Sequence, residues 1–205
     1  NSVAIDGSYA IIGAQEYYGN DNDKGKVYIY NVDNRNLDFS MIGESDSDFF
    51  GNSVAIDGSY AIVGAPYYDY NNGKVYIYKK AEDNNWNLDF SMIGENGGEL
   101  GSSVALSDNF AIVGAPDYDG KVYIYKKADN VDNSWNLVFS MSGENESDKF
   151  GYCVAISDNY AIVGAPYYDG DSYVDNGKVY IYVKITDNNW NLDFSMIGDN
   201  TNDQL

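Results

Sequence analysis

Closely spaced carboxylates occur in the loops that follow four Gly-Ala-Pro-like triplets. The triplets end at Gln15, Pro66, Pro116 and Pro166, and the aspartate pairs behind them are Asp21 and Asp23, Asp117 and Asp119, and Asp169 and Asp171. Such pairs could bind Ca²⁺ with backbone carbonyls and water, since Ca²⁺ takes about six to eight oxygens. No copy has the full Asp-x-Asp-x-Asp-Gly spacing of a dedicated calcium loop. We therefore interpret them as solvated turn carboxylates, with no cofactor required, and keep a calcium site as the alternative.

Tyrosines gather in the same loops. They are Tyr17, Tyr18, Tyr67, Tyr68, Tyr70, Tyr118, Tyr167, Tyr168 and Tyr173. A tyrosine ring has an apolar body and a polar tip, so it can stack on a sugar or anchor a protein contact. The alternative interpretation is structural: the first tyrosine of each adjacent pair packs between neighbouring repeats, and the second lies on the surface without a partner.

The composition gives catalysis little support. The sequence has no histidine, which excludes Ser-His-Asp and Cys-His arrangements and imidazole metal sites. Glycoside hydrolysis needs two carboxylates at a set separation in a cleft, and the 32 acidic residues are spread through the loops. Cys153 stands where other repeats have serine, so we expect it to be a small, buried and inert residue. We predict that the chain is not an enzyme.

Charge narrows the possible partners. Twelve basic residues against 32 acidic ones give a net charge of −20, which repels nucleic acid and anionic lipid. The mean hydropathy of −0.44 and the scattered apolar residues argue against insertion into a membrane. Asn145 begins an N-glycosylation sequon, which matters only in a secreted eukaryotic protein.

The elements that must position these loops come from an internal repeat. Phe50-Gly51, Leu100-Gly101 and Phe150-Gly151 recur at intervals of 50 residues, and the repeats are about 1–49, 50–99, 100–149 and 150–205. No segment has the three-to-four spacing of an apolar helix. Repeats of this length with several strands are typical of propeller blades.

Four strands are predicted in each repeat. In the second repeat they are 53–56, 60–65, 75–78 and 87–92, with a tight turn at Asp57-Gly58 between the first two. The last strand alternates, which predicts that Leu88, Phe90 and Met92 share the buried face. Trp86, Trp135 and Trp190 open this strand, and Arg35 takes that place in the first repeat. The fold class is therefore all-β: a propeller of four-stranded antiparallel blades.

A Gly-Lys step opens the third strand of every repeat. Its lysines are Lys26, Lys74, Lys121 and Lys178. The step opens a strand and lacks the spacing of a phosphate-binding loop. We expect each lysine to pair with a nearby acid such as Glu44, Glu95, Glu144 or Asp199, at under about 1 kcal/mol if exposed.

The segments 50–56, 62–66 and 73–78 resemble the FG-GAP repeat, the blade unit of integrin-type propellers, in its compact microbial form. The resemblance covers essentially the whole chain and implies an extracellular or cell-surface protein. The turns at the positions of the family's calcium loop, such as 57–59, are too short to wrap a cation, so that site is not expected here.

Family propellers commonly have seven blades, so we favour a segment of a longer array over a self-closing ring of four. Exposed edges of an open array would template assembly. The predicted function is a non-catalytic scaffold for protein–protein interaction, adhesion or self-assembly. The alternative is a carbohydrate-binding module that uses the tyrosine-rich loops.

Overall fold

The computed structural model describes residues 2–17, 24–83, 85–129, 134–169, 175–200 and 202–204. Within these residues there are four sheets, each of four antiparallel strands in chain order. The strands are β1 (Ser2–Asp6), β2 (Tyr9–Ala14), β3 (Lys26–Asn31), β4 (Asn36–Ile42), β5 (Ser53–Asp57), β6 (Tyr60–Ala65), β7 (Lys74–Lys80), β8 (Trp86–Ile93), β9 (Ser103–Ser107), β10 (Phe110–Ala115), β11 (Lys121–Lys127), β12 (Trp135–Ser142), β13 (Cys153–Ile156), β14 (Tyr160–Ala165), β15 (Lys178–Thr186) and β16 (Asn189–Ile197). Helical structure in the described residues is limited to the turns α1 (Tyr68–Asn71) and η1 (Glu146–Asp148). The predicted all-β fold is confirmed.

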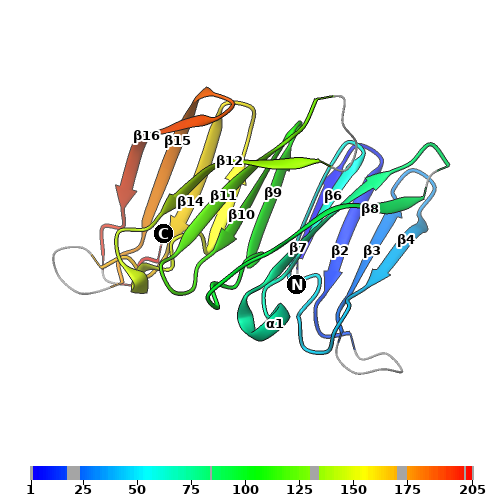
Figure 1. The fold of residues 1–205 in the computed structure, drawn as a ribbon, viewed down its shortest axis with the longest axis horizontal. Coiled ribbons are helices and arrows are strands. Elements are labelled where there is room, and N and C mark those ends of the chain that lie inside the picture. The colour runs from blue at the N-terminus through cyan, green and yellow to red at the C-terminus, as the bar shows by residue number, and fades with distance from the viewer. Residues whose placement is uncertain are drawn as a thin grey trace.

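The four sheets stand side by side in a row as the blades of a β-propeller (Figure 1). The first strands of successive sheets contact one another, β1 with β5, β5 with β9 and β9 with β13. The first and fourth sheets lie at opposite ends of the row (Figure 1). The arrangement is therefore open and differs from a self-closing ring of four.

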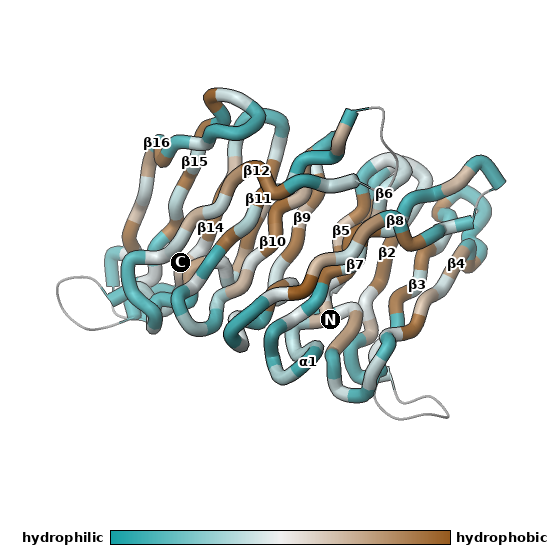
Figure 2. Tube along the Cα trace, viewed as in Figure 1, coloured by the Kyte–Doolittle hydropathy of each residue, from teal (hydrophilic) through white to brown (hydrophobic). Residues whose placement is uncertain are grey.

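Apolar residues lie along the strands, and hydrophilic residues lie at the loops of both edges (Figure 2). Three buried clusters fill the spaces between neighbouring sheets, and we call them the first, second and third seams in chain order. The second seam, for example, brings Ile62 and Ile77 of one sheet against Val113 and Trp135 of the next. Each sheet therefore has a leading face toward the preceding repeat and a trailing face toward the following one.

The Phe-Gly and Gly-Ala-Pro segments meet at each seam. The Gly51 N–H donates to the Gly64 carbonyl of its own sheet at 3.0 Å. On the other side, a Cβ built on Gly13 of the preceding sheet would stand 2.0 Å from the Gly51 carbonyl oxygen. The same approach recurs between Gly64 and Gly101 and between Gly114 and Gly151. Only glycine allows the backbones to come this close.

The outermost strands differ from the predicted alternation. A register shift between Ile77 and Tyr78 pairs Ile77 with Phe90 and Tyr78 with Leu88, so Asp89 becomes the extra residue of a bulge. Leu88 is consequently 52% exposed and Asp89 is buried. The prediction that Leu88 shares the buried face is wrong, and the same holds for Leu37, Leu137 and Leu192.

Candidate interaction surfaces

The leading face of the first sheet is open to solvent. Val54 and Ile56 on the leading face of the second sheet are 5% and 6% exposed, because they are covered in the first seam. The corresponding residues of the first sheet, Val3 and Ile5, are 73% and 69% exposed. Arg35 is also exposed on this sheet, at the position where the other repeats bury a tryptophan.

The trailing face of the fourth sheet is open as well. Ile162 is 42% exposed, whereas its counterparts Ile62 and Ile112 are completely buried in the second and third seams. Phe194 and Met196 on β16 are also exposed, and Tyr160 lies at the start of β14. The row of sheets thus ends in two apolar faces built from the same positions that pack internally.

The lysines of the Gly-Lys steps bridge two of the seams. Lys74 Nζ lies 2.9 Å from both Glu44 carboxylate oxygens, and Lys178 pairs with Oε1 of Glu144. Each lysine also lies over two tyrosine rings of its own repeat. The hydrogen bond from Lys178 holds the pKa of Glu144 below its usual value. The predicted pairing is confirmed for these two lysines.

The second seam departs from this pattern. Lys121 pairs with Asp119 of its own repeat at 3.2 Å, and the hydrogen bond that Lys121 donates to Asp119 raises the pKa of Lys121. In the first repeat, Lys26 lies over the rings of Tyr17 and Tyr28.

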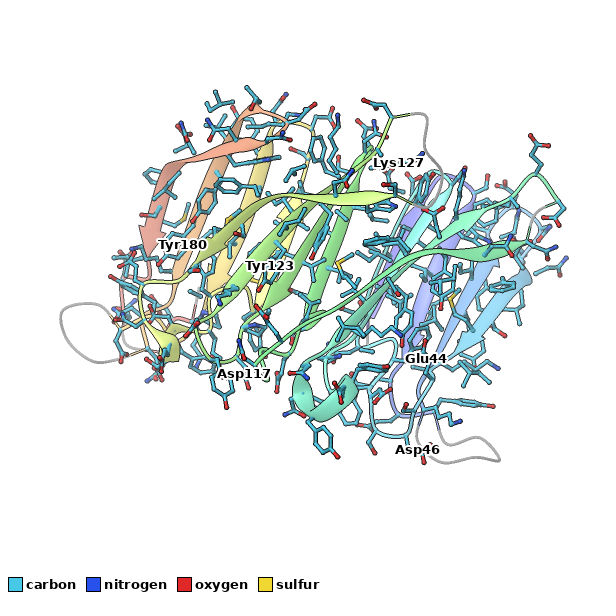
Figure 3. All side chains as sticks on the ribbon, in the orientation of Figure 1. Glu44, Asp46, Asp117, Tyr123, Lys127 and Tyr180 are labelled. Carbon is cyan, nitrogen blue, oxygen red and sulfur yellow. The ribbon has the colours of Figure 1, made fainter. Side chains whose placement is uncertain are left out.

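The tryptophans pack edge-on against an aromatic ring of the preceding repeat. Tyr9 meets Trp86, Tyr60 meets Trp135 and Phe110 meets Trp190, with ring centroids 5.7 to 5.9 Å apart. A lysine lies over each of these preceding rings, among them Lys127 over Tyr60, and Figure 3 shows Lys127 in the upper part of the molecule. The Trp135 indole N–H also donates to Asp89 Oδ2 at 3.1 Å. The indole nitrogens of Trp86 and Trp190 are buried without a partner among the described residues.

The tyrosine pairs pack in the opposite order from the structural interpretation. Tyr68 and Tyr168, the second members, pack against the first and third seams. Tyr67 and Tyr167, the first members, are exposed, and Tyr67 packs on the Phe49 ring with centroids 4.8 Å apart. The strands end at Ala65 and Ala165, and the first tyrosine of each pair lies in the turn that begins at Pro66 or Pro166.

The remaining predicted tyrosines are spread over the loop edge. Tyr70 and Tyr118 are largely exposed, at 95% and 66%. Tyr17 is half-buried beside Lys26. Tyr18 and Tyr173 lie outside the described residues.

A hollow on this edge is lined by residues of all four repeats, with Gln15 from the first. Its lining includes Tyr67, Glu99, Asp117, Lys149 and Tyr152, and Figure 3 places Asp117 on the lower, loop-bearing edge. Lys149 pairs with Asp117. Desolvation raises the pKa of Glu99, and the Glu99 charge in turn raises the pKa of Tyr67. Sequence reasoning missed Glu99, Lys149 and Tyr152, because nothing in their spacing signals that the fold brings them together.

The candidate calcium ligands that the structure describes are Asp117, Asp119 and Asp169, and each has another partner. Asp117 and Asp119 are each paired with a lysine, and the Asp169 carboxylate accepts the Asp175 N–H at 2.9 Å. No three metal-ligating side chains cluster in the part of the chain that the structure describes. Asp21, Asp23 and Asp171 lie outside the described residues.

Two further residues can be placed. Asn145 is exposed and caps η1, where its backbone N–H donates to Asp148 Oδ2 at 3.2 Å.

Cys153 is exposed, so the prediction of a buried cysteine is wrong. Its counterpart Ser53 is covered in the second seam and donates to the Gly101 carbonyl at 2.6 Å. Cys153 instead lies on the open trailing face of the fourth sheet.

The fold is similar to that of a solved structure. The chain is similar to a hypothetical selenium-binding protein from Sulfolobus tokodaii, with a TM-score of 0.57 and 10% identity over 93% of this chain and 52% of that one. It therefore spans about half the length of that structure, and the likeness concerns the fold alone.

No curated protein matches the sequence. No helix among the described residues is long and apolar enough to cross a bilayer. The model of the FG-GAP repeat matches residues 1–30, 43–78 and 140–182, more than half of the sequence. The chain belongs to the FG-GAP repeat family.

Proposed function

We propose that this chain is a non-catalytic propeller scaffold of the cell exterior that binds protein, including itself, through its two open faces. The observation that carries the proposal is the exposure of Val3 and Ile5, whose counterparts Val54 and Ile56 are buried. Burying one such side chain stabilises a protein by roughly 1.5–3 kcal/mol. Contiguous apolar surface of this kind is typical of interaction sites.

The charge supports the same function. A net charge of −20 keeps a protein with open apolar faces soluble, because copies repel one another until a specific contact outweighs the repulsion. FG-GAP repeats are typical of extracellular proteins, which supports a location outside the cell and a role in adhesion or assembly.

Sedimentation velocity over a range of protein concentrations tests the proposal. We expect the 205-residue chain to associate reversibly, and Val3→Glu/Ile5→Glu to remain monomeric, since two carboxylates would have to be desolvated in the contact. Leu88→Glu/Leu137→Glu is the matched control, because both leucines are exposed on outer strands rather than end faces. Equal association of all three proteins would contradict the proposal.

Carbohydrate binding is the second candidate, supported by the hollow with Tyr67, Glu99 and Tyr152. Aromatic rings beside polar groups suit a sugar. A glycan array tests it: Tyr67→Ala should abolish binding, and Tyr118→Ala should retain it, because Tyr118 does not line this hollow. The absence of any glycan signal from the unaltered chain would remove this candidate.

A further inference from the structure

We propose that the occupant of each open face is the opposite face of a second copy, docked head-to-tail, with Arg35 of one copy paired to Asp193 of the other. This inference rests on the proposed function and names the partner and the contacts. It treats the contact between copies as a fourth seam built like the three inside the chain.

The apolar parts of a fourth seam are already present. On the trailing side, Ile162, Ile181 and Met196 occupy the positions of Ile62, Ile77 and Met92, which are buried in the second seam. On the leading side, Val3 and Ile5 occupy the positions of Val54 and Ile56, which are buried in the first seam. Each open face therefore carries the residues that its counterpart already packs against.

The polar residues of the two open faces differ from those of the internal seams in a complementary way. In the second seam, the Trp135 indole N–H donates to Asp89 across the two sheets at 3.1 Å. The fourth sheet has Asp193 at the position of Asp89, and the first sheet has Arg35 at the position of Trp135. Docking by the same geometry brings the Arg35 guanidinium to the Asp193 carboxylate. Both side chains are exposed, and the ion pairs found among the described residues involve neither of them.

This pair belongs to the contact between copies and to no seam within the chain. The first seam has Asp38 and Trp86 at these positions, and the third has Val138 and Trp190, so a charged donor stands opposite a carboxylate only where copies meet. An arginine–carboxylate pair is more strongly attractive and more directional than an indole–carboxylate hydrogen bond. An arginine on the leading face also disfavours packing onto an uncharged trailing face, because its charge would be buried unpaired.

A second pair follows from the lysines. Lys74 binds Glu44 of the preceding sheet, and Lys178 binds Glu144. At the ends of the row the corresponding groups are Lys26 and Asp199. Lys26 lies over two tyrosine rings, as Lys74 does, and Asp199 is exposed. Head-to-tail docking brings Lys26 of one copy to Asp199 of the other.

A head-to-tail contact closes into a ring when its rotation allows, and otherwise continues as a fibre. The smallest closed form is a dimer with two identical contacts, and it is the form that we expect.

Charge reversal in separate chains tests the pairing. Arg35→Glu and Asp193→Arg should each weaken self-association at least about tenfold, because every contact then opposes like charges. An equimolar mixture of the two variants should associate within about threefold of the unaltered chain, since both contacts in the mixed dimer again pair opposite charges. Native mass spectrometry should show the mixed dimer. Glu82→Arg is the control for charge alone, because Glu82 is exposed in the turn between β7 and β8, away from both end faces.

The outcomes separate the two proposals. Failure of the mixture to associate, with Val3→Glu/Ile5→Glu still disrupting the unaltered dimer, would overturn head-to-tail pairing and leave end-face binding intact. An unaltered chain that stays monomeric at all concentrations would overturn both. Circular dichroism of each single variant distinguishes lost association from lost folding, and recovery in the mixture requires that both variants fold.

Discussion

Trp135 donates its indole N–H to the carboxylate of Asp89, which a bulge has turned into the space between the second and third sheets. Both residues are buried. A buried carboxylate must be compensated by hydrogen bonds or charge, so this contact stabilises the packing of one repeat on the next.

Trp135→Phe should therefore lower the free energy of unfolding by about 1–3 kcal/mol beyond the loss of contact area, because Asp89 is left buried without its donor. Urea denaturation measures the change. Trp86→Phe is the matched control, since the Trp86 nitrogen has no partner among the described residues. Equal losses in the two variants would show that the hydrogen bond contributes nothing.

Glu144→Gln should lower stability at neutral pH by under about 1 kcal/mol, because its carboxylate is half-exposed. The folded-state pKa of Glu144 is held below 4.5 by Lys178. The stabilisation is then present above the ordinary pKa and is lost as pH falls through the folded value. Urea titrations at pH 7 and pH 3 check this. Glu95→Gln should show a smaller effect, because Lys121 pairs with Asp119 instead.

Asp48→Asn should have the opposite dependence on pH. Asp48 is buried and its Oδ2 has no partner among the described residues, so desolvation raises its pKa. The folded state then prefers the protonated form, and the unaltered protein loses stability as pH rises through the ordinary value toward the folded one. In thermal melts, the melting temperature of the variant minus that of the unaltered protein should be larger at pH 7 than at pH 3. A difference independent of pH would contradict the assignment.

Cys153 should report on the contact between copies. It is exposed on the open trailing face, while its counterpart Ser53 is covered by the next sheet. The rate of thiol labelling should fall as protein concentration rises and copies associate. In Val3→Glu/Ile5→Glu the rate should not vary with concentration. A constant rate in the unaltered chain, under conditions where it sediments as a dimer, would place the contact elsewhere.

Gly64→Ala should destabilise the fold by several kcal/mol, roughly the cost of severe overpacking, because its Cβ would stand 2.0 Å from the Gly101 carbonyl oxygen. Gly58→Ala is the control: its φ is +55° but open space surrounds it, so the cost should be near about 1 kcal/mol. Thermal denaturation separates the two.

The repeat, its strands and the burial of the central strands between neighbouring sheets could be predicted, because they depend on the local sequence pattern. Tyr60–Ala65 is apolar on both faces and is a central strand, and the Asp57-Gly58 turn has the positive φ at Gly58 that a hairpin needs. The burial of Asp89 and the exposure of Leu88 could not be predicted, because a single register shift decides them.

The candidate sites were harder to predict. The exposed positions of Cys153, Val3 and Ile5 depend on which sheets have a neighbour, and the local sequence of these residues is nearly that of their buried counterparts. The order of packing within Tyr67 and Tyr68 depends on the direction in which the chain leaves Pro66, which residue type alone does not specify.

The glycine of each Phe-Gly or Leu-Gly step, such as Gly101, has a consequence for the cooperativity of unfolding. Because Gly101 donates to Gly114 in its own sheet while its carbonyl presses on Gly64 in the previous one, two blades share one short piece of backbone. Unfolding of either blade exposes the apolar face that the other blade packs against. We therefore expect unfolding to start at a terminal blade of the row and to proceed blade by blade. A partner that covers an end would then slow unravelling of the entire molecule.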